Sequence, residues 1–409
     1  MWRSAVGPVE RFLSIEASSG IVLIAVAALA LLWVNSAWAP LYHALGHVPF
    51  GLRLGSLVFE RDLHFWINDV LMTVFFFVVG LEIRRELHHG ELSDLRRAAL
   101  PVVAALGGMA APALIFLALN WGRPSMGAWA IPTATDIAFA VGVLSLLGKR
   151  VPPALRILLL ALAVIDDVGA IVIITLFYSS DLSVLGLVVM ALGAGVLRLM
   201  QSMGVRSVLA YGIPALAMWG GAHHAGVHPA LSGVVVGLMT PVVVWQGHEA
   251  VSPSARLTEA LHGWVAFVIM PLFALANAGV PLGNVSFAGD GVVVFLGVAL
   301  GLGLGKPLGI VASAWLTTQL GLTALPQGMR WSHVGLVGLV GGIGFTMALF
   351  VAQLAFPPGP LLETAKLGII LGSAGAALVS LLVGRLLLPA QLEPGAATSA
   401  SEAEASTER

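Results

Sequence analysis

The sequence contains no cysteine, which excludes disulfide bridges, thiolate metal sites and redox-active thiol pairs. Charge is also scarce, because Asp, Glu, Lys and Arg make up 10% of the residues and the formal net charge is −1. Proteins that bind nucleic acid usually present a basic surface, so this balance gives no support for a nucleic-acid partner. We expect no enzymatic activity and no resident cofactor.

Hydrophobic residues, by contrast, make up 58% of the chain, and the mean hydropathy is +0.96. These values exclude a soluble globular class. The 48 glycines fit closely packed transmembrane helices, in which small residues let backbones approach. The first residues do not resemble a cleavable signal peptide, because arginines alternate with Glu10 and Glu16 and no small-residue cleavage site stands out. The sequence therefore predicts an all-α polytopic membrane protein in contact with a lipid bilayer.

Apolar runs of about 20 residues, the length that crosses a bilayer, recur along the chain. No segment between them is long enough to fold alone. We expect one transmembrane domain over residues 1–388, followed by a disordered cytoplasmic tail over 389–409 that is rich in Ala, Ser and Glu. The roughly twelve expected spans lie near residues 18–36, 63–87, 98–119, 127–147, 154–178, 183–200, 206–222, 228–245, 258–278, 291–317, 332–355 and 362–388.

The basic residues indicate how these spans are oriented. If the N-terminus is cytoplasmic, 15 of the 20 Lys and Arg residues fall on the cytoplasmic side. Cytoplasmic loops carry such an excess, so both termini are expected inside. The exceptions are Lys306, which lies within a span, and Arg53, Arg61, Arg123 and Lys366, which lie on the opposite side.

Two adjacent aspartates, Asp166 and Asp167, stand in the middle of the apolar run from Ala154 to Phe177. As a helix this run is about 36 Å long, so both carboxylates fall near the middle of the bilayer. Each charged group there costs about 2.5–3.5 kcal/mol to insert. Ion pairs that hold helices together are the alternative explanation, but Lys306 supplies too little charge for two carboxylates. The cost therefore indicates a functional site.

A pair of close carboxylates can hold either protons or a small hard cation, because both compete for the same oxygens. Neighbouring residues on a helix point about 100° apart, so one aspartate faces the site and the other flanks it. The two carboxylates do not ionise independently. Asp136 adds an acidic group at comparable depth in the fourth span, whereas for Asp69 in the second span a structural role is an equal alternative.

Two of the spans have sequences that interrupt a helix. The fourth has Pro132 and two threonines just before Asp136, and the eleventh is dense in glycine over residues 338–344. Interrupted segments at corresponding positions of two halves indicate a transporter's binding site. The repeats around them, spans 3–5 and 10–12, would be inverted in the membrane. A closely packed glycine-rich helix is the alternative for the eleventh span.

Three further features have less specific explanations. Glu82, Arg85 and Glu86 lie at the cytoplasmic end of the second span, where a solvated helix end is the simpler interpretation. His223, His224 and His228 suggest a metal site, but with no acidic residue nearby in sequence they are interpreted as surface histidines. The stretch near 52–61 alternates on its first arm, residues 52–54, and contains Gly-Ser at a possible two-residue turn. This pattern predicts a β-hairpin, and an ordinary extended loop is the alternative.

Taken in order, a set of short motifs resembles the NhaA family of Na+/H+ antiporters over nearly the whole chain. Each motif is weak alone, but their order and spacing are specific. They are residues 66–69 (WIND), 79–82 (VGLE), 134–140 (ATDIAFA), 165–167 (IDD), 226–228 (GVH), 271–274 (PLFA) with 276–279 (ANAG), 305–309 (GKPLG) and 342–347 (GIGFTM).

The resemblance implies a homodimer that contacts its partner through the 52–61 hairpin, in a bacterial inner membrane. It implies exchange of two H+ for one Na+ or Li+, with activation at alkaline pH. Asp166 and Asp167 would form the cation and proton site. The resemblance also implies that Thr135, Asp136, Lys306, Gly341, Gly342 and Gly344 lie where two interrupted helices cross and compensate the charges of the half-helix ends.

The family also associates a set of positions with pH response. One departure is clear, because the family usually has Glu-His after Arg-Leu and this chain has Thr258-Glu259. A shift of one residue turns a side chain about 100° around a helix, so the pH set-point is in question while transport is not. The pH-response positions are Glu82, Arg85, Glu86, His228, Arg256, Glu259 and His262.

Two other functions remain open at this point. A sodium-coupled solute symporter of related architecture would use the aspartates for Na+ alone. An intramembrane aspartyl protease needs two aspartates that meet from different helices, and the adjacent pair beside Lys306 fits that requirement poorly. Adding Na+ to everted vesicles distinguishes an antiporter from such a symporter, because only an antiporter collapses an acid interior without an organic solute.

Overall fold

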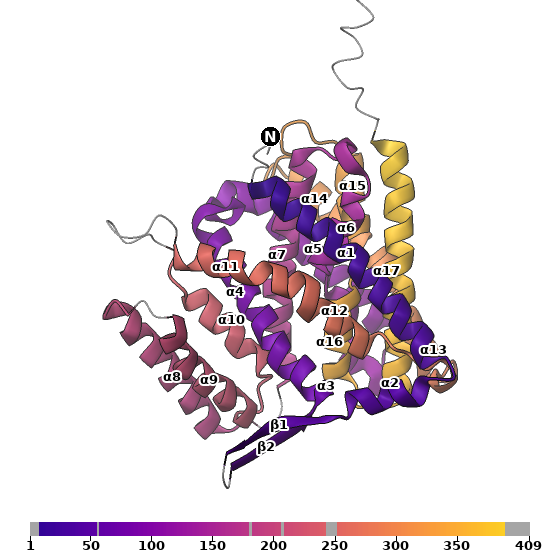
Figure 1. Cartoon of the computed structure of the whole chain (residues 1–409). Helices are drawn as coiled ribbons and strands as arrows, with labels where there is room; N and C mark the ends of the chain where they lie inside the picture. The colour runs from indigo at the N-terminus through magenta and orange to yellow at the C-terminus, as the bar shows by residue number, and fades with distance from the viewer. Residues whose placement is uncertain (1–7, 55–56, 180–181, 206–207, 243–251, 389–409) are drawn as a thin grey trace, which may run out of the picture.

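A computed structural model of the chain describes residues 8–54, 57–179, 182–205, 208–242 and 252–388. The expected tail over 389–409 lies outside these residues. Most of the described chain is helical, as predicted, and the helices form one bundle (Figure 1). The start of α1 (Pro8–Val34) and the end of α17 (Pro360–Leu387) lie at one face of the bundle, here called the terminal face.

The opposite face, here called the hairpin face, carries a two-stranded antiparallel sheet (Figure 1). β1 (Pro49–Leu54) pairs with β2 (Leu57–Asp62), and Leu54 stands opposite Leu57. This pairing confirms the predicted hairpin, whereas the Gly-Ser pair at its expected turn, residues 55 and 56, lies outside the described residues. α2 (Ala39–Gly46) precedes the sheet, is bent by 115° from α1, and has no buried residue, so it does not continue the first span.

Seven described segments are long and apolar enough to cross a membrane, and up to ten are if each bent helix pair counts as one span. Two more predicted spans coincide with shorter helices, α9 (Val208–His224) and α10 (Ala230–Met239). The four spans that are single helices are α5 (Leu95–Leu119), α7 (Pro153–Phe177), α8 (Val184–Ser202) and α17.

Three spans change to a π-helical turn part-way. Such turns relax the i→i+4 ladder and are frequent at functional sites. The segments are α3 (Leu63–Phe65), η1 (Trp66–Leu71) and α4 (Met72–His89); α11 (Pro253–Trp264), η6 (Val265–Ile269) and α12 (Met270–Asn277); and α13 (Asp290–Leu300), η8 (Gly301–Gly305) and α14 (Lys306–Gln319).

Two spans are broken near their middle, as the sequence predicts. The first half of the fourth span is Pro124–Thr133, which contains η3 (Pro124–Ala128) and η4 (Ile131–Thr133), and its second half is α6 (Ile137–Ser145). The eleventh consists of α15 (Trp331–Gly341) and α16 (Phe345–Ala355). The two halves are bent by 45° in the fourth span and by 47° in the eleventh. The remaining short turns are η2 (Glu91–Ser93), η5 (Gly148–Arg150) and η7 (Leu282–Asn284).

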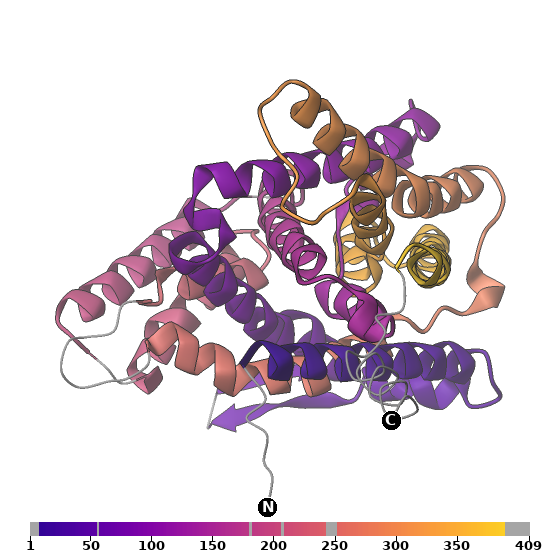
Figure 2. The ribbon, with the colours of Figure 1, turned by 90° about the horizontal axis from the view of Figure 1, so that it is seen from above.

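Small residues let the helices approach closely where they pack. Gly107 of α5 faces Gly309 of α14, and Gly80 of α4 faces Gly237 of α10. Seen from above, α17 is viewed nearly along its axis while α1 runs across the bundle, where it packs against α6 and α12 (Figure 2). α7 buries the side that carries Asp166 and Asp167 and exposes another side, on which Ile157 and Val172 lie.

Candidate ion site

The two broken spans cross at their breaks. The backbone N–H of Asp136 donates to the carbonyl of Ile343, with 2.8 Å between the heavy atoms. The crossing requires glycine, because a Cβ on Gly342 would lie 2.5 Å from the backbone oxygen of Leu302. A Cβ on Gly344 would meet the side chain of that leucine at 2.7 Å and the carbonyl oxygen of Ala134 at 2.9 Å. Gly341 is buried beside them.

Asp136 lies at the N-termini of both α6 and α16. Its Oδ1 accepts from the backbone N–H of Phe139 at 3.0 Å, and its Oδ2 accepts from the backbone N–H of Thr346 at 3.0 Å. The Thr346 hydroxyl also donates to Oδ2. Because helix N-termini carry partial positive charge, one carboxylate here compensates two of them.

The carbonyl ends of the first halves meet donors. The buried Lys306 donates from Nζ to the carbonyl oxygen of Thr133, at the end of η4. The hydroxyl of Thr135 lies 3.0 Å from the carbonyl oxygen of Gly341, at the end of α15. A cation and a hydroxyl therefore lie where the helix ends carry partial negative charge.

Asp166 is joined to this crossing from α7. Its Oδ2 lies 2.8 Å from the Lys306 ammonium and 2.6 Å from the Thr135 hydroxyl, and neither charged side chain is exposed. The hydroxyl has one proton and donates to one acceptor at a time. The other oxygen, Oδ1, is buried without a hydrogen-bond partner. A buried carboxylate oxygen without a donor is an unfilled acceptor, which a proton or a cation can occupy.

Asp167 points to a different environment. No hydrogen bond or ion pair within the described residues joins its carboxylate. Together with Asp136 it lines a cavity of about 60 Å³ between α4, α6, α16 and the span from α11 to α12. The cavity has room for an ion or a few water molecules. Since Lys306 is paired with Asp166 and Asp136 with two helix ends, the charge of Asp167 is the one left uncompensated.

The expected pH-response positions of the sequence analysis are spread over several parts of the bundle. Glu82 and His262 line the cavity beside Asp167, and Arg85 interacts electrostatically with both. Arg256 lines a different cavity. The Thr258 side chain is buried where α11 packs against α4, whereas Glu259 is exposed. The acidic side chain of this pair therefore does not occupy the buried position. Glu86 lies one helical turn beyond Glu82, nearer the terminal face.

His228 corrects one expectation. Its side chain is 15% exposed, so it is not a surface histidine, and its Nε2 lies 3.9 Å from an Asp69 carboxylate oxygen. The expectation was wrong because the acidic partner comes from a distant span. His223 and His224 are exposed, but they end α9 instead of lying in a loop. No cluster of three His, Cys, Asp or Glu side chains able to hold a metal was found in the described chain.

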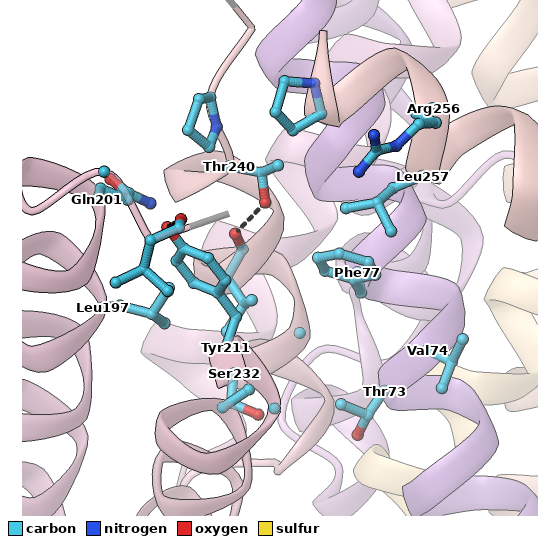
Figure 3. Close-up of a pocket in the computed structure, with 18 residues that line it drawn as sticks. Thr73, Val74, Phe77, Leu197, Gln201, Tyr211, Ser232, Thr240, Arg256 and Leu257 are labelled. Atoms are coloured by element: carbon cyan, nitrogen blue, oxygen red, sulfur yellow. Dashed lines mark hydrogen bonds between the residues drawn. The ribbon is translucent and has the colours of Figure 1, made fainter. Parts of the chain in front are cut away.

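A larger cavity, of about 340 Å³, lies away from the aspartates. It is enclosed by α4, α8, α9, α10 and α11, and Figure 3 shows Phe77, Leu197 and Tyr211 among its mostly apolar side chains with Arg256 on one side. None of the mid-membrane aspartates lines it. No carboxylate of the described residues lines this larger cavity, whereas the carboxylates of Glu82, Asp136 and Asp167 line the smaller one.

Sequence reasoning missed several residues of the crossing. Thr346 and the backbone carbonyl of Thr133 contact Asp136 and Lys306, and Ser373 of α17 accepts from the backbone N–H of Phe345 at 3.1 Å. Their one signal in the sequence is position, because the threonines flank the breaks. Ser373 has no such signal, since it comes from a continuous helix.

Known proteins are similar to this chain over nearly its whole length. Residues 10–383 match the family model described as Na+/H+ antiporter 1. A Sorangium cellulosum protein named Na(+)/H(+) antiporter NhaA 2 is 54% identical over 98% of this chain and 94% of its own length. A Myxococcus xanthus protein of the same name is 50% identical, over 99% and 94%. A Bordetella petrii protein named Na(+)/H(+) antiporter NhaA is 48% identical, over 93% and 91%.

Proposed function

Because this chain belongs to the Na+/H+ antiporter 1 family, we propose that it exchanges Na+ or Li+ for protons across a bacterial inner membrane. The excess of basic residues on the terminal face supports cytoplasmic termini. Asp166 and Asp167 hold the transported ions. The observation that carries this proposal is a buried carboxylate pair in which one oxygen has no donor and one carboxylate lines a cavity.

The exchange follows from competition for these oxygens. Na+ is a hard cation that takes carboxylate, carbonyl and hydroxyl oxygens, and near Asp167 it must displace protons from the same atoms. We propose that two protons leave the group of Asp166, Asp167 and Lys306 for each Na+ bound. One net charge then moves per cycle, and 100 mV across the membrane supplies about 2.3 kcal/mol to export sodium.

The volume of the cavity beside Asp167 argues against the alternative of a sodium-coupled solute symporter. Pockets for organic solutes usually occupy about 300–1,000 Å³, and the cavity beside Asp167 is about 60 Å³. It suits an ion and not a solute. Proton exchange without a solute is therefore the function that this geometry supports best.

A vesicle experiment tests the exchange. Everted vesicles with an acid interior should lose their pH gradient when Na+ is added, without any organic solute. Asp166→Asn and Asp167→Asn should each abolish this response. Asp290→Asn is the matched control, because Asp290 pairs with Arg123 outside the ion site and its loss should leave exchange intact. Exchange retained in both site variants would refute the assignment.

The same vesicles test the stoichiometry. If two protons compete with one Na+, the half-saturating Na+ concentration should rise by up to about 100-fold per unit fall in pH at acid pH, whereas one proton gives about tenfold. A half-saturating concentration that does not change with pH would contradict competition altogether.

We further propose that access to the site alternates between the two faces, that groups near the cavity adjust this to pH, and that the protein is a homodimer. Glu82 and His262 line the cavity and can change charge beside Asp167. The hairpin supports dimerisation, because Phe50 and Phe59 are 61% and 41% exposed on it. Exposed aromatics on a strand pair favour an intermolecular contact.

A further inference from the structure

α16 connects the ion site to the hairpin face. Its first turn carries Thr346, which bonds Asp136, and Met347, which lines the cavity. Phe350 and Gln353 follow at three-residue intervals toward the hairpin face. Of these residues of α16 only Met347 lines the cavity, and neither Phe350 nor Gln353 does.

Aromatic rings form the first layer beyond the cavity. The buried Phe350 ring has its centroid 5.3 Å from that of Phe76 on α4 and 6.3 Å from that of Phe273 on α12. The His228 ring meets it edge-on at 4.9 Å. Rings packed at these distances leave no room for water between them.

Side-chain amides form a second layer. The Gln353 amide donates to Asn277 Oδ1, and Asn277 Nδ2 donates to Asn68 Oδ1 at 2.7 Å. Asn68 Nδ2 in turn lies 2.7 Å from a ring nitrogen of His64. Asn277 is fully buried, so these bonds satisfy polar groups that would otherwise be costly in the bundle. The amides join α16 to α12 and to the start of the second span.

We propose that these two layers form a gate that closes the route from the hairpin face to Asp167, with the hydrogen bond between Gln353 and Asn277 as its latch. The inference rests on the proposed alternating access. α16 is tied to the ion site through Asp136, whereas Phe76, Phe273 and Asn277 belong to the facing helices. Opening separates α16 from those helices and breaks the latch, while the bond between Asn277 and Asn68 stays within the facing wall.

Removing the latch should therefore destabilise the closed state alone. In the open state water replaces the lost hydrogen bond, so little is lost there. The net worth of one such bond corresponds to about a fivefold change in the ratio of open to closed molecules. The closed form remains dominant because the aromatic layer is intact.

Labelling of a single cysteine measures this ratio without measuring transport. The chain has no cysteine, and Ala266 is a small buried residue that lines the cavity. Ala266→Cys should react slowly with a membrane-impermeant thiol reagent added at the hairpin face. Adding Gln353→Leu should raise that rate about fivefold and leave labelling from the terminal face nearly unchanged.

Two variants serve as controls. Gln201→Leu removes a comparable amide bond, from Gln201 to the carbonyl of Met239, and should not change labelling. Asn68→Ala breaks a bond inside the facing wall and should change it less than twofold. The proposal is overturned if Gln353→Leu has no effect at the hairpin face, if it speeds labelling from both faces equally, or if either control matches it. Failure of Na+/H+ exchange, measured separately, would refute the proposed function and not the gate contacts.

Discussion

Asp166 and Asp167 are adjacent in sequence but differ in what surrounds their carboxylates. Asp166 is bonded to Lys306 and Thr135, whereas no described residue bonds Asp167, which lines the cavity. The 100° step between neighbouring helix positions produces this difference. In the proposed function both carboxylates bind ions, and Asp166 in addition stabilises the crossing through Lys306 and Thr135.

This difference predicts opposite effects on stability. Asp166→Asn leaves Lys306 buried without its counter-charge and should lower the free energy of unfolding by about 3 kcal/mol. Asp167→Asn removes an uncompensated buried charge and should leave stability unchanged or raise it. Thermal unfolding of the purified proteins checks this. Equal destabilisation by both substitutions would contradict the pairing.

A second residue-scale prediction concerns Thr258. Thr258→Glu places a carboxylate on the buried side of α11, one helical turn from His262, which lines the cavity together with Glu82. A nearby negative charge favours the protonated forms of those groups, so the midpoint of the pH–activity curve should move upward by about one unit.

The exposed Glu259 provides the matched control. Glu259→Gln should leave the midpoint in place, because water screens its charge. Thr258→Val separates the effect of charge from that of packing and should also leave it in place. A shift caused by Glu259→Gln would show that the exposed carboxylate takes part in the pH response after all.

At the scale of elements, the crossing depends on broken helices that fit closely. Asp136 caps the second half of each broken span. At Gly342 and Gly344 there is no side chain beyond a hydrogen atom, so the neighbouring backbone can approach closely. The breaks expose helix ends to the ion site, which an unbroken helix cannot do.

Gly342→Ala tests this fit. The added methyl meets the Leu302 carbonyl, so the substitution should cost about 1–3 kcal/mol of stability and displace the crossing enough to reduce exchange. Gly335→Ala, on the same broken span, adds its methyl in open space and should be neutral or slightly stabilising. Unfolding and vesicle assays of both variants check this. Equal effects would mean that close approach at the crossing is not the cause.

At the scale of the whole molecule, the proposed dimer separates assembly from transport. The helices α6, α7 and α16 lie within one bundle, and the hairpin lies at its edge (Figure 1). Replacing the hairpin, residues 49–62, by a short Gly-Ser linker should abolish the dimer while each monomer retains exchange.

Mass measurement in native conditions and the vesicle assay together check this prediction. A dimer that survives the deletion would place the contact elsewhere. Loss of exchange in a folded monomer would mean that transport requires both copies.

Much of this fold could be predicted from the sequence because bilayer chemistry leaves a strong pattern. Helix spans, both broken segments and the strand pair agree with the structure. The bend of α2 and the π-turns before Lys306 and at Asp69 were not predicted. They depend on packing against other spans, which leaves no periodic signal in the local sequence.

The amino-acid sequence by itself determined that the two adjacent aspartates lie near the middle of the membrane. Each of them needs a partner or a function there, because lipid does not tolerate an uncompensated charge. Only the tertiary structure decided which partner each received. Lys306 lies about 140 residues from Asp166 in sequence and 2.8 Å from it in space, and Asp69 meets His228 in the same way. Pairing of this kind follows from how helices cross, and a helix encodes which face is polar but not which other helix will meet that face.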